Sequence, residues 1–539
     1  MRPILTFLRF QFAPRLEVNP VQCVGQPPYP MLNPSRRKFL KNTALVAGAM
    51  LTARSWAQVA GANGDVRVAV VGLNGRGKNH LTSLAKVAGV RIAAICDVDT
   101  AILESVAADL AKDGLAPEKF TDLRALLASP GIDAITVATP NHWHALAAIW
   151  ACQAGKDVYV EKPVSHNIWE GRQLVAAAAK YNRVVQAGVQ IRSGEGLIEA
   201  VDWVRSGQLG RITAARGFCY KRRKSIGHTP GTPTPPPTVN YDLWLGPARE
   251  EPPHRTRFHY DWHWFNTYGN GDVGNQGIHQ MDVARWFLGE SGLPRSTLSI
   301  GGRLGYKDDG ETPNTQIIVH DYATAPLIFE VRGLPAKYDP AENQPGAGGA
   351  EAAGALAASM DKYRGFNVGN VIDCEGGSVV TGSYFSATAY DRDGKVVREF
   401  HGQDRHMQNF IDVVRSRKTK ELYGPIDEGH ISSALCHLGG ISHRTGHAVS
   451  PDERKSLAAQ ADQIFGGAYR RLGEHLAANQ IDPEKYPLTM GMPLSIDKTG
   501  ERFLETKPYA WGATAANAAQ ANPLLTRDYR APYTVPQLA

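Results

Sequence analysis

A chain of 539 residues is long enough to form two or three domains with cores of their own. Its 43% hydrophobic and 21% charged residues are typical of a soluble globular protein. The net charge of +7 comes from scattered basic residues, and the one dense run, Lys221–Lys224, has the pattern of a solvated loop and accompanies no nucleic-acid-binding motif, so we expect no nucleic-acid partner.

The N-terminal region, residues 1–57, has the pattern of an export signal. Twin arginines within Ser35–Lys41 precede a weakly apolar stretch, Ala44–Leu51, and small residues lead up to Ala57. We therefore expect cleavage after Ala57, export by the twin-arginine machinery and a periplasmic location, with Met31 as a second candidate start. The apolar stretch is too short to span a bilayer, and no longer one follows, so we expect no stable membrane span.

Between residues 65 and 192, short β-branched strands alternate with helical patterns. This alternation predicts an α/β fold with a doubly wound parallel sheet, the Rossmann arrangement that binds dinucleotides. The expected strands are Val66–Val71, Val90–Cys96, Ile135–Ala138, Asp157–Val160 and Val184–Gly188, and the expected helices are Ala101–Ala111, Ala145–Ala154 and Trp169–Tyr181.

From residue 193 to 450 the pattern predicts an α+β domain with an open mixed or antiparallel sheet, for substrate binding and oligomerisation. An Ala/Gly-rich insertion at 341–359 and a C-terminal extension at 451–539 complete the chain. We expect Arg527–Pro532 in this extension to wrap around the domain or a partner subunit. The expected strands are Gln316–His320, Leu327–Val331 and Val379–Tyr390, and the expected helices are Ile278–Leu288, Gln408–Ser416 and His430–Arg444.

A glycine loop, Gly72-Leu73-Asn74-Gly75-Arg76-Gly77, follows the first expected strand. Between a strand and a helix, such a loop lets backbone N–H groups approach a pyrophosphate at the helix N-terminus. Asp97 ends the second strand, where a carboxylate binds the adenosine ribose hydroxyls and repels a 2′-phosphate, so NAD is favoured over NADP. Asn74 stands at the second glycine position of the fingerprint, and Arg76 is placed to reach the phosphates or the adenine.

Two further motifs follow the glycine loop, Ala138-Thr139-Pro140-Asn141-His142-Trp143-His144 and Tyr159-Val160-Glu161-Lys162-Pro163-Val164. A Lys-Pro pair at a strand end places an amine at the mouth of a nucleotide-binding sheet. Over roughly residues 65–450, this order of motifs resembles the glucose–fructose oxidoreductase / inositol dehydrogenase (Gfo/Idh/MocA) family. The resemblance implies an NAD(P)-dependent enzyme that acts on a sugar or cyclitol and forms a homo-oligomer.

The resemblance also implies roles for single residues. Three of them, Thr139, Asn141 and His144, are expected along the nicotinamide half of the cofactor. Glu161 and Lys162 are expected to close over its ribose and reacting face. Gln190 and Arg192 are expected at the ring edge or the substrate.

The predicted substrate site lies in the segment 261–282. Its aromatic residues, among them Trp264 and Tyr268, are suited to stacking on sugar faces. In the resembling family the equivalent of His279 is the general base, and an imidazole suits this task because its pKa lies near neutral pH. Lys162 would polarise the same hydroxyl oxygen. Asn275 stands where sugar dehydrogenases of the family commonly have Asp, and an amide can bind a hydroxyl without accepting its proton.

The cysteine and histidine spacings predict no metal site, because neither a CxxC pair nor an HExxH motif occurs. Cys96 and Cys152 lie in apolar strand and helix patterns and are expected to be buried thiols.

Three functions remain open at this stage. The leading hypothesis is an NAD-dependent oxidoreductase that moves a hydride between a sugar or glycoside hydroxyl and a tightly bound cofactor. The second is a redox-assisted glycosidase, which oxidises a hydroxyl transiently. The third is a non-enzymatic periplasmic sugar-binding protein, which Asn74 and Asn275 alone favour.

Overall fold

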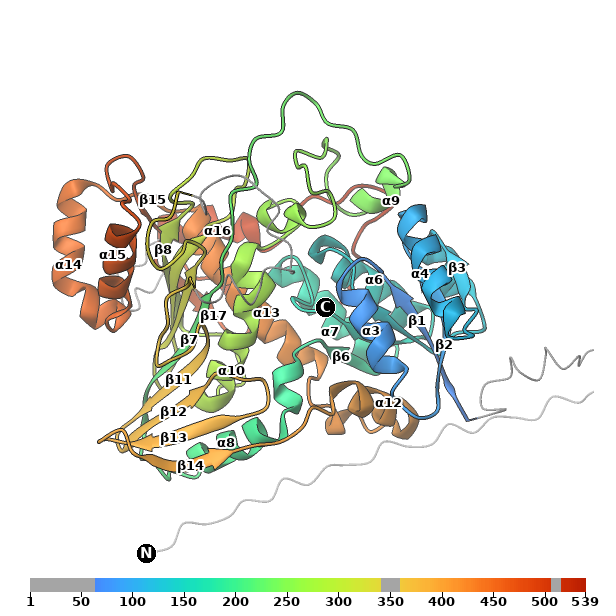
Figure 1. Cartoon of the computed structure of the whole chain (residues 1–539), viewed down its shortest axis with the longest axis horizontal. Coiled ribbons are helices and arrows are strands. Elements are labelled where there is room, and N and C mark those ends of the chain that lie inside the picture. The colour runs from blue at the N-terminus through green and yellow to red at the C-terminus, as the bar shows by residue number, and fades with distance from the viewer. Residues whose placement is uncertain (1–63, 341–358, 506–514) are drawn as a thin grey trace, which may run out of the picture. The chain divides into compact units, whose positions relative to one another are not determined.

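A computed structural model of the chain describes residues 64–340, 359–505 and 515–539 (Figure 1). The expected export signal lies outside these residues, as does nearly all of the expected insertion at 341–359. The elements described below belong to one unit, Gln58–Ala539. Within the described part of the chain, no helix has both the length and the hydropathy that a membrane crossing requires.

The first domain is built on a six-stranded parallel sheet in the order β3-β2-β1-β4-β5-β6. This strand order is that of a dinucleotide-binding Rossmann fold, so the predicted fold class is confirmed. The strands are β1 (Val66–Val71), β2 (Val90–Cys96), β3 (Glu118–Phe120), β4 (Ala134–Val137), β5 (Asp157–Val160) and β6 (Val185–Ala187). The helices are α3 (Arg76–Leu84), α4 (Thr100–Lys112), α5 (Leu123–Ala128), α6 (Asn141–Gln153) and α7 (Ile168–Lys180).

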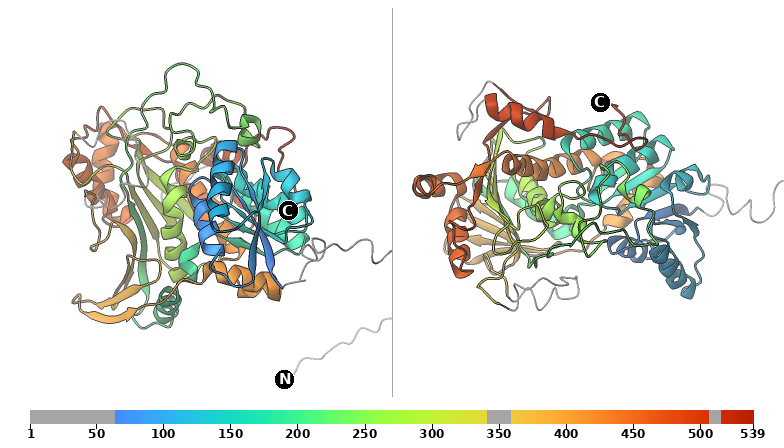
Figure 2. Two further views of the ribbon diagram at one scale, coloured as in Figure 1. Left: turned by 45° about the vertical axis from the view of Figure 1, so that its right-hand side comes forward. Right: turned by 90° about the horizontal axis from the view of Figure 1, so that it is seen from above.

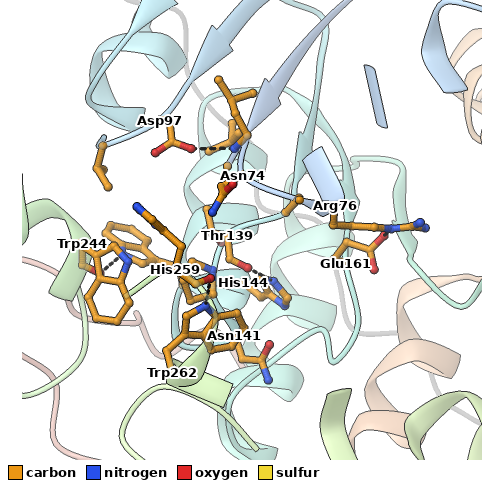
Figure 3. Close-up of a pocket in the computed structure, with 18 of the residues that line it drawn as sticks. Asn74, Arg76, Asp97, Thr139, Asn141, His144, Glu161, Trp244, His259 and Trp262 are labelled. Atoms are coloured by element: carbon orange, nitrogen blue, oxygen red, sulfur yellow. Dashed lines mark hydrogen bonds and ion pairs between the residues drawn. The ribbon is translucent and has the colours of Figure 1, made fainter. Parts of the chain in front are cut away.

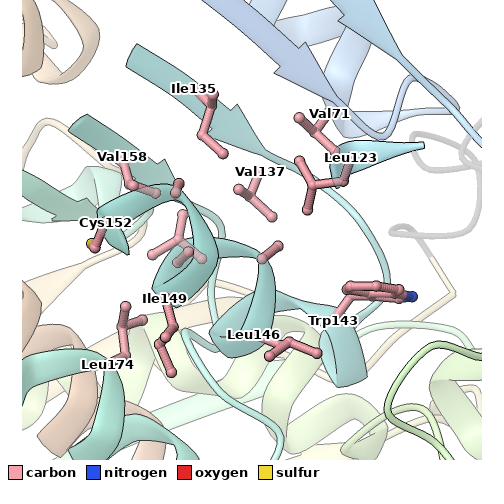
Figure 4. Packing of buried hydrophobic residues seen from close by; sticks show 14 of the residues in the cluster. Val71, Leu123, Ile135, Val137, Trp143, Leu146, Ile149, Cys152, Val158 and Leu174 are labelled. Carbon is pink, nitrogen blue, oxygen red and sulfur yellow. The ribbon is translucent and has the colours of Figure 1, made fainter. Parts of the chain in front are cut away.

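Helix α6 begins four residues before the expected start at Ala145, directly after Pro140. A proline at a helix start costs no hydrogen bond, since the first backbone N–H groups have no partner within the helix. The motif Asn141–His144 is therefore the first turn of a helix whose buried face packs on the sheet (Figure 4). Ile135 and Val137 of β4 contribute to this core together with Leu146 of α6.

The second domain contains a larger mixed sheet, ordered β14-β13-β12-β11-β7-β10-β9-β8-β16-β15, in which β7 and β10 are parallel and the other neighbours antiparallel. Its main strands are β7 (Ile212–Tyr220), β8 (Ser296–Gly302), β9 (Thr315–Asp321), β10 (Leu327–Arg332), β11 (Val368–Cys374), β12 (Gly377–Thr381), β13 (Ala387–Asp391) and β14 (Val396–Phe400). The short strands are β15 (His447–Ala448), β16 (Thr489–Met490), β17 (Leu494–Asp497) and β18 (Arg502–Phe503). The segment expected as one strand, Val379–Tyr390, is a hairpin of β12 and β13.

The helices of this domain are α8 (Glu195–Arg205), α9 (Tyr241–Leu245), α10 (Ile278–Leu288), α12 (His406–Ser416), α13 (Ile426–Arg444), α14 (Pro451–Phe465), α15 (Ala468–Ala478) and α16 (Ala515–Ala521). Helices α10 and α13 lie between the two sheets (Figures 1 and 2), and α13 contacts both α7 and β8. Helix α12 returns to the Rossmann sheet, where Phe410 and Ile411 join its core.

The C-terminal segment also returns to the Rossmann domain. Arg527 donates to the His142 carbonyl oxygen at 2.9 Å and forms an ion pair with Glu170 of α7 at 2.8 Å. Tyr533 is buried in the core beside α6. The segment Arg527–Pro532 thus contacts the chain's own Rossmann domain and also its second domain, where Arg530 pairs with Asp242 of α9.

Candidate functional site

A cavity of about 340 Å³, here called the glycine-loop cavity, lies at the carboxyl ends of β1, β2, β4 and β5 (Figure 3). Gly72, at a φ of +82°, ends β1 there, and a Cβ on it would lie 2.7 Å from the Ala138 carbonyl group. Only glycine therefore lets the loop approach the end of β4 so closely. A Cβ on Gly77 would in turn lie 1.9 Å from the Gly72 oxygen, so the first turn of α3 depends on this residue as well.

Asp97 lies in the same cavity, as expected from its place after β2. Its Oδ2 accepts a hydrogen bond from the Leu73 backbone at 2.7 Å, and its Oδ1 accepts one from the Asp99 backbone at 3.0 Å. Burial raises the pKa of Asp97, although these two hydrogen bonds oppose that effect. The carboxylate is thus fixed at the end of β2, where a dinucleotide of this fold places its adenosine ribose.

The Asn141–His144 turn forms one wall of the cavity together with Thr139. The Thr139 Oγ1 atom is buried and has no partner in the protein, so it remains available to a bound molecule. Asn141 Nδ2 donates to Asn270 at 3.0 Å, and the two ring nitrogens of His144 lie 2.6 and 2.7 Å from the carbonyl oxygens of Pro163 and Thr139. An unpartnered hydroxyl beside a glycine-rich loop and a fixed carboxylate fits a dinucleotide.

Glu161 is the centre of an ionic network at the inner end of this cavity. Its carboxylate accepts from Arg76 Nε at 2.7 Å and Gln190 Nε2 at 3.1 Å, and it lies 3.0 Å from His80 Nε2. Burial alone would raise the pKa of Glu161, but Arg76 and His80 outweigh it and hold the pKa well below its usual range. Arg76, which we expected to reach the phosphates or adenine, is thus held by Glu161.

Lys162 is half-buried beside this network and lines the wall between two cavities. Its Nζ donates to the Asn275 backbone carbonyl oxygen. Burial lowers the pKa of Lys162 to about 8; Glu161 opposes this effect, and the charge of Arg76 adds to it. The amine therefore titrates much closer to neutral pH than an ordinary lysine does.

The second cavity, here called the His279 cavity, measures about 410 Å³. Arg76, Glu161, Lys162 and Asn275 line both it and the glycine-loop cavity. The remaining lining residues are His80, Ser83, Tyr159, Gln190, Gln276, His279, Tyr384, Phe385, Asp404, His406 and Met407.

His279 stands on the first turn of α10, and its Nδ1 atom is buried without a partner. Its ring centroid lies 5.4 Å from that of Tyr384. Burial, reinforced by the charge of Lys162, holds the pKa of His279 well below 6.5. The imidazole is therefore neutral at neutral pH and can accept a proton.

Three residues expected at the substrate lie elsewhere. Trp264 and Tyr268 are 4% and 1% exposed and belong to an aromatic core, so neither lines either of the two cavities. Arg192 lies 2.9 Å from Asp282 and also pairs with Glu428 at 3.0 Å. These three assignments are corrected: an aromatic residue or arginine in a motif can equally serve packing or a buried ion pair.

Other residues of the two cavities were not expected. Trp244, His259 and Trp262 lie across the glycine-loop cavity from Asn74 and Asp97 (Figure 3). Trp262 belongs to the same aromatic run as Trp264. Both lie in the 3₁₀ turn Asp261–Trp264, but it is Trp262 that lines the cavity. Tyr384 lies in the turn between β12 and β13, and no sequence signal links that hairpin to the site.

Cys96 and Cys152 are buried free thiols, as expected. Across residues 64–340, 359–505 and 515–539, no group of His, Cys, Asp and Glu is arranged to hold a metal ion.

Comparisons with known proteins assign this architecture to a family. Residues 66–189 match an oxidoreductase family's NAD-binding Rossmann fold, and residues 202–308 match the C-terminal α/β domain of that family. The first domain is thus an NAD-binding Rossmann domain. These two domains of the chain belong to the Gfo/Idh/MocA oxidoreductase family.

Individual relatives share low sequence identity with this chain. A glycosyl hydrolase family 109 protein of Shewanella sp. (strain W3-18-1) is 29% identical over 230 residues, which are 38% of this chain and 50% of the relative. One from Shewanella woodyi is 30% identical over 152 residues, 27% of this chain and 32% of the relative. The chain thus spans half the length of these curated relatives or less. The WlbA dehydrogenase of Chromobacterium violaceum, solved with NADH and UDP-GlcNAcA, shares the fold at a TM-score of 0.51 and 19% identity, over 71% of this chain and 94% of that one.

Proposed function

We propose that the protein is an NAD-dependent oxidoreductase that removes a hydride from a hydroxyl-bearing carbon of a sugar or glycoside. The observation that supports this most strongly is the position of Lys162 in the wall shared by two cavities. One cavity carries the glycine loop and Asp97, which fit the cofactor, and the other carries the neutral imidazole of His279. A substrate hydroxyl in the second cavity would meet an amine and a base together.

The chemistry follows from these protonation states. NAD, when bound, supplies the acceptor for the hydride that leaves the alcohol carbon with its electron pair. His279 accepts the hydroxyl proton as the carbonyl forms, and Lys162, still protonated below pH 8, donates a hydrogen bond to the same oxygen. The Asn275 carbonyl oxygen holds Lys162 in place, so this residue acts through its backbone instead of as a second base.

The location and handling of the cofactor are part of the proposal. We propose export by the twin-arginine machinery to the periplasm, supported by the arginine pair and apolar stretch before Ala57. Since free dinucleotide is scarce there, the protein would hold NAD tightly and re-oxidise NADH with a second substrate, as a homo-oligomer of the family type. N-terminal sequencing of the mature protein tests the cleavage site, and light scattering tests the oligomer.

The central experiment uses mature protein purified from the periplasm. The protein is denatured, any released nucleotide is identified, and its redox state is compared before and after incubation with a panel of sugars and glycosides. We expect bound NAD that becomes NADH with one of them. If the protein contains no dinucleotide, and Lys162→Ala changes no measured turnover, the protein would instead be a sugar-binding protein.

A redox-assisted glycosidase is the second candidate, and the curated relatives named as glycosyl hydrolase family 109 proteins favour it. Oxidation of a ring hydroxyl acidifies the neighbouring C–H, so the aglycone can be eliminated, water added, and the ketone reduced again. Release of nitrophenol from a nitrophenyl glycoside, with bound NAD unchanged at the end, would establish this reaction. Net accumulation of NADH without nitrophenol would exclude it.

A further inference from the structure

A third cavity, here called the α13 cavity, measures about 770 Å³ and takes no part in the proposed redox reaction. Its walls come from the C-terminal half of α13, the segments 266–273 and 311–316, the start of α7 and the C-terminal segment 523–528. Five segments distant in sequence thus line one space. Its volume falls within the roughly 300–1,000 Å³ of small-molecule sites.

Three residues that line this cavity carry buried polar atoms without a protein partner. Thr312 is 4% exposed, yet its Oγ1 bonds to no protein group. Both ring nitrogens of His166 and the Nδ1 of His443 are also buried without partners. A buried polar group without a partner is costly, so such atoms mark a place where a ligand or water completes the hydrogen bonding.

The protonation states of the histidines make these open groups neutral. Burial holds the pKa of His166 well below 6.5 and lowers that of His443 to about 4. A neutral imidazole offers one donor and one acceptor, and the Thr312 hydroxyl offers both as well. A sugar hydroxyl has the same dual character.

The charges around the cavity are largely offset. Arg527 pairs with Glu170 at 2.8 Å, and Arg249 pairs with Glu251 at 2.7 Å. Arg444 is opposed by the charge of Glu311, and Asp528 adds a further carboxylate to the lining. This balance gives an anionic ligand no advantage over a neutral one.

We propose that the α13 cavity is a second ligand site, which binds a neutral polyhydroxylated molecule of about monosaccharide size. Its hydroxyl groups pair with Thr312 Oγ1 and the rings of His166 and His443. The site is close to the glycine-loop cavity: Asn270, which lines it, donates to the His166 carbonyl oxygen at 3.1 Å and accepts from Asn141 of the glycine-loop cavity at 3.0 Å. This goes beyond the redox reaction and does not depend on it.

The test is calorimetric titration of the purified mature protein with D-glucose, myo-inositol and N-acetyl-D-glucosamine, and with D-glucuronate as a charged counterpart. Thr312→Val and His166→Phe remove the open polar atoms at nearly constant shape. Thr297→Val is the matched control, because Thr297 has the same buried, unpartnered Oγ1 but does not line the cavity. His279→Ala reports any binding in the His279 cavity.

We expect at least one neutral probe to bind, with affinity about fivefold weaker in Thr312→Val and in His166→Phe, as for a lost neutral hydrogen bond, and unchanged in Thr297→Val and His279→Ala. The proposal is overturned if no neutral probe binds at millimolar concentration, which would leave a water-filled cavity. It is equally overturned if glucuronate binds more tightly than glucose, or if only His279→Ala weakens the binding.

Discussion

The glycine-loop cavity and the His279 cavity share one wall but are built in different ways. In the first, most polar groups are already bonded to the protein: Asp97 to two backbone amides, His144 to two carbonyl oxygens and Asn141 to Asn270. In the second, His279 keeps a buried nitrogen without a partner, and the Lys162 pKa is shifted toward neutrality.

This difference separates the residues that hold the cofactor from those that take part in the reaction. Groups whose hydrogen bonds are satisfied keep a rigid surface for a cofactor, whereas an unpartnered base beside a shifted amine is poised for proton transfer. Substitutions on one side of the wall should therefore change cofactor retention or choice, and those on the other side should change turnover.

The largest effect is expected for His279→Ala. Loss of a general base lowers turnover by about 10²–10⁴-fold, while bound NAD is retained because the glycine-loop cavity is untouched. The measurement is single-turnover formation of NADH together with the nucleotide content of the protein. His228→Ala, on an exposed loop histidine, is the control. Loss of both NAD and turnover in His279→Ala would contradict the separation.

The second effect concerns Trp264, which the sequence placed at the substrate and the structure places in the aromatic core. Trp264→Ala should lower the free energy of unfolding by about 3–5 kcal/mol, as for other buried large-to-small changes, and leave KM of the folded protein unchanged. Chemical denaturation and steady-state kinetics measure the two effects. A raised KM with an unchanged free energy of unfolding would instead indicate that Trp264 contacts the substrate.

The same contrast explains what could be predicted from the sequence. The glycine-loop cavity forms where neighbouring parallel strands end, so Gly72, Asp97 and Thr139 could be found from motifs in one contiguous region. The His279 cavity joins six separated segments. Outside the glycine loop and the Lys-Pro motif, only Gln190, Asn275 and His279 were expected in it. Tyr384 could not be found, because its hairpin reaches the site through tertiary packing alone.

The pH dependence of kcat/KM should follow the protonation of Lys162. With its pKa at about 8, the amine is charged at neutral pH, and kcat/KM should fall about tenfold per pH unit above pH 8 as this donor loses its proton. Because the His279 pKa lies well below 6.5, no loss is expected near pH 6.5 on the acid side. A pH–rate profile measures both limbs. An increase of kcat/KM through pH 8 would mean that neutral Lys162 is the base.

A smaller effect is expected for Asp97→Asn. The amide keeps an acceptor for one backbone N–H but lacks the charge that disfavours a 2′-phosphate, so the ratio of kcat/KM for NADP to that for NAD should rise about tenfold. After removal of bound nucleotide, both cofactors are compared in the wild type and the variant. An unchanged ratio would show that Asp97 does not face the ribose.

The smallest effect is expected for Tyr384→Phe, at the edge of the His279 cavity. The Tyr384 hydroxyl accepts a hydrogen bond from Gln276 Nε2 at 3.3 Å, and Gln276 Oε1 accepts one from Lys221 at 2.6 Å. Tyr384→Phe keeps the ring beside His279 but releases Gln276, so KM for the sugar should rise about two- to fivefold with kcat nearly constant, the size of one neutral hydrogen bond. Tyr390→Phe, on the same hairpin but outside the cavity, should change neither constant. A fall in kcat in Tyr384→Phe would instead make this hydroxyl part of the proton path, because removing it would then slow the chemical step itself.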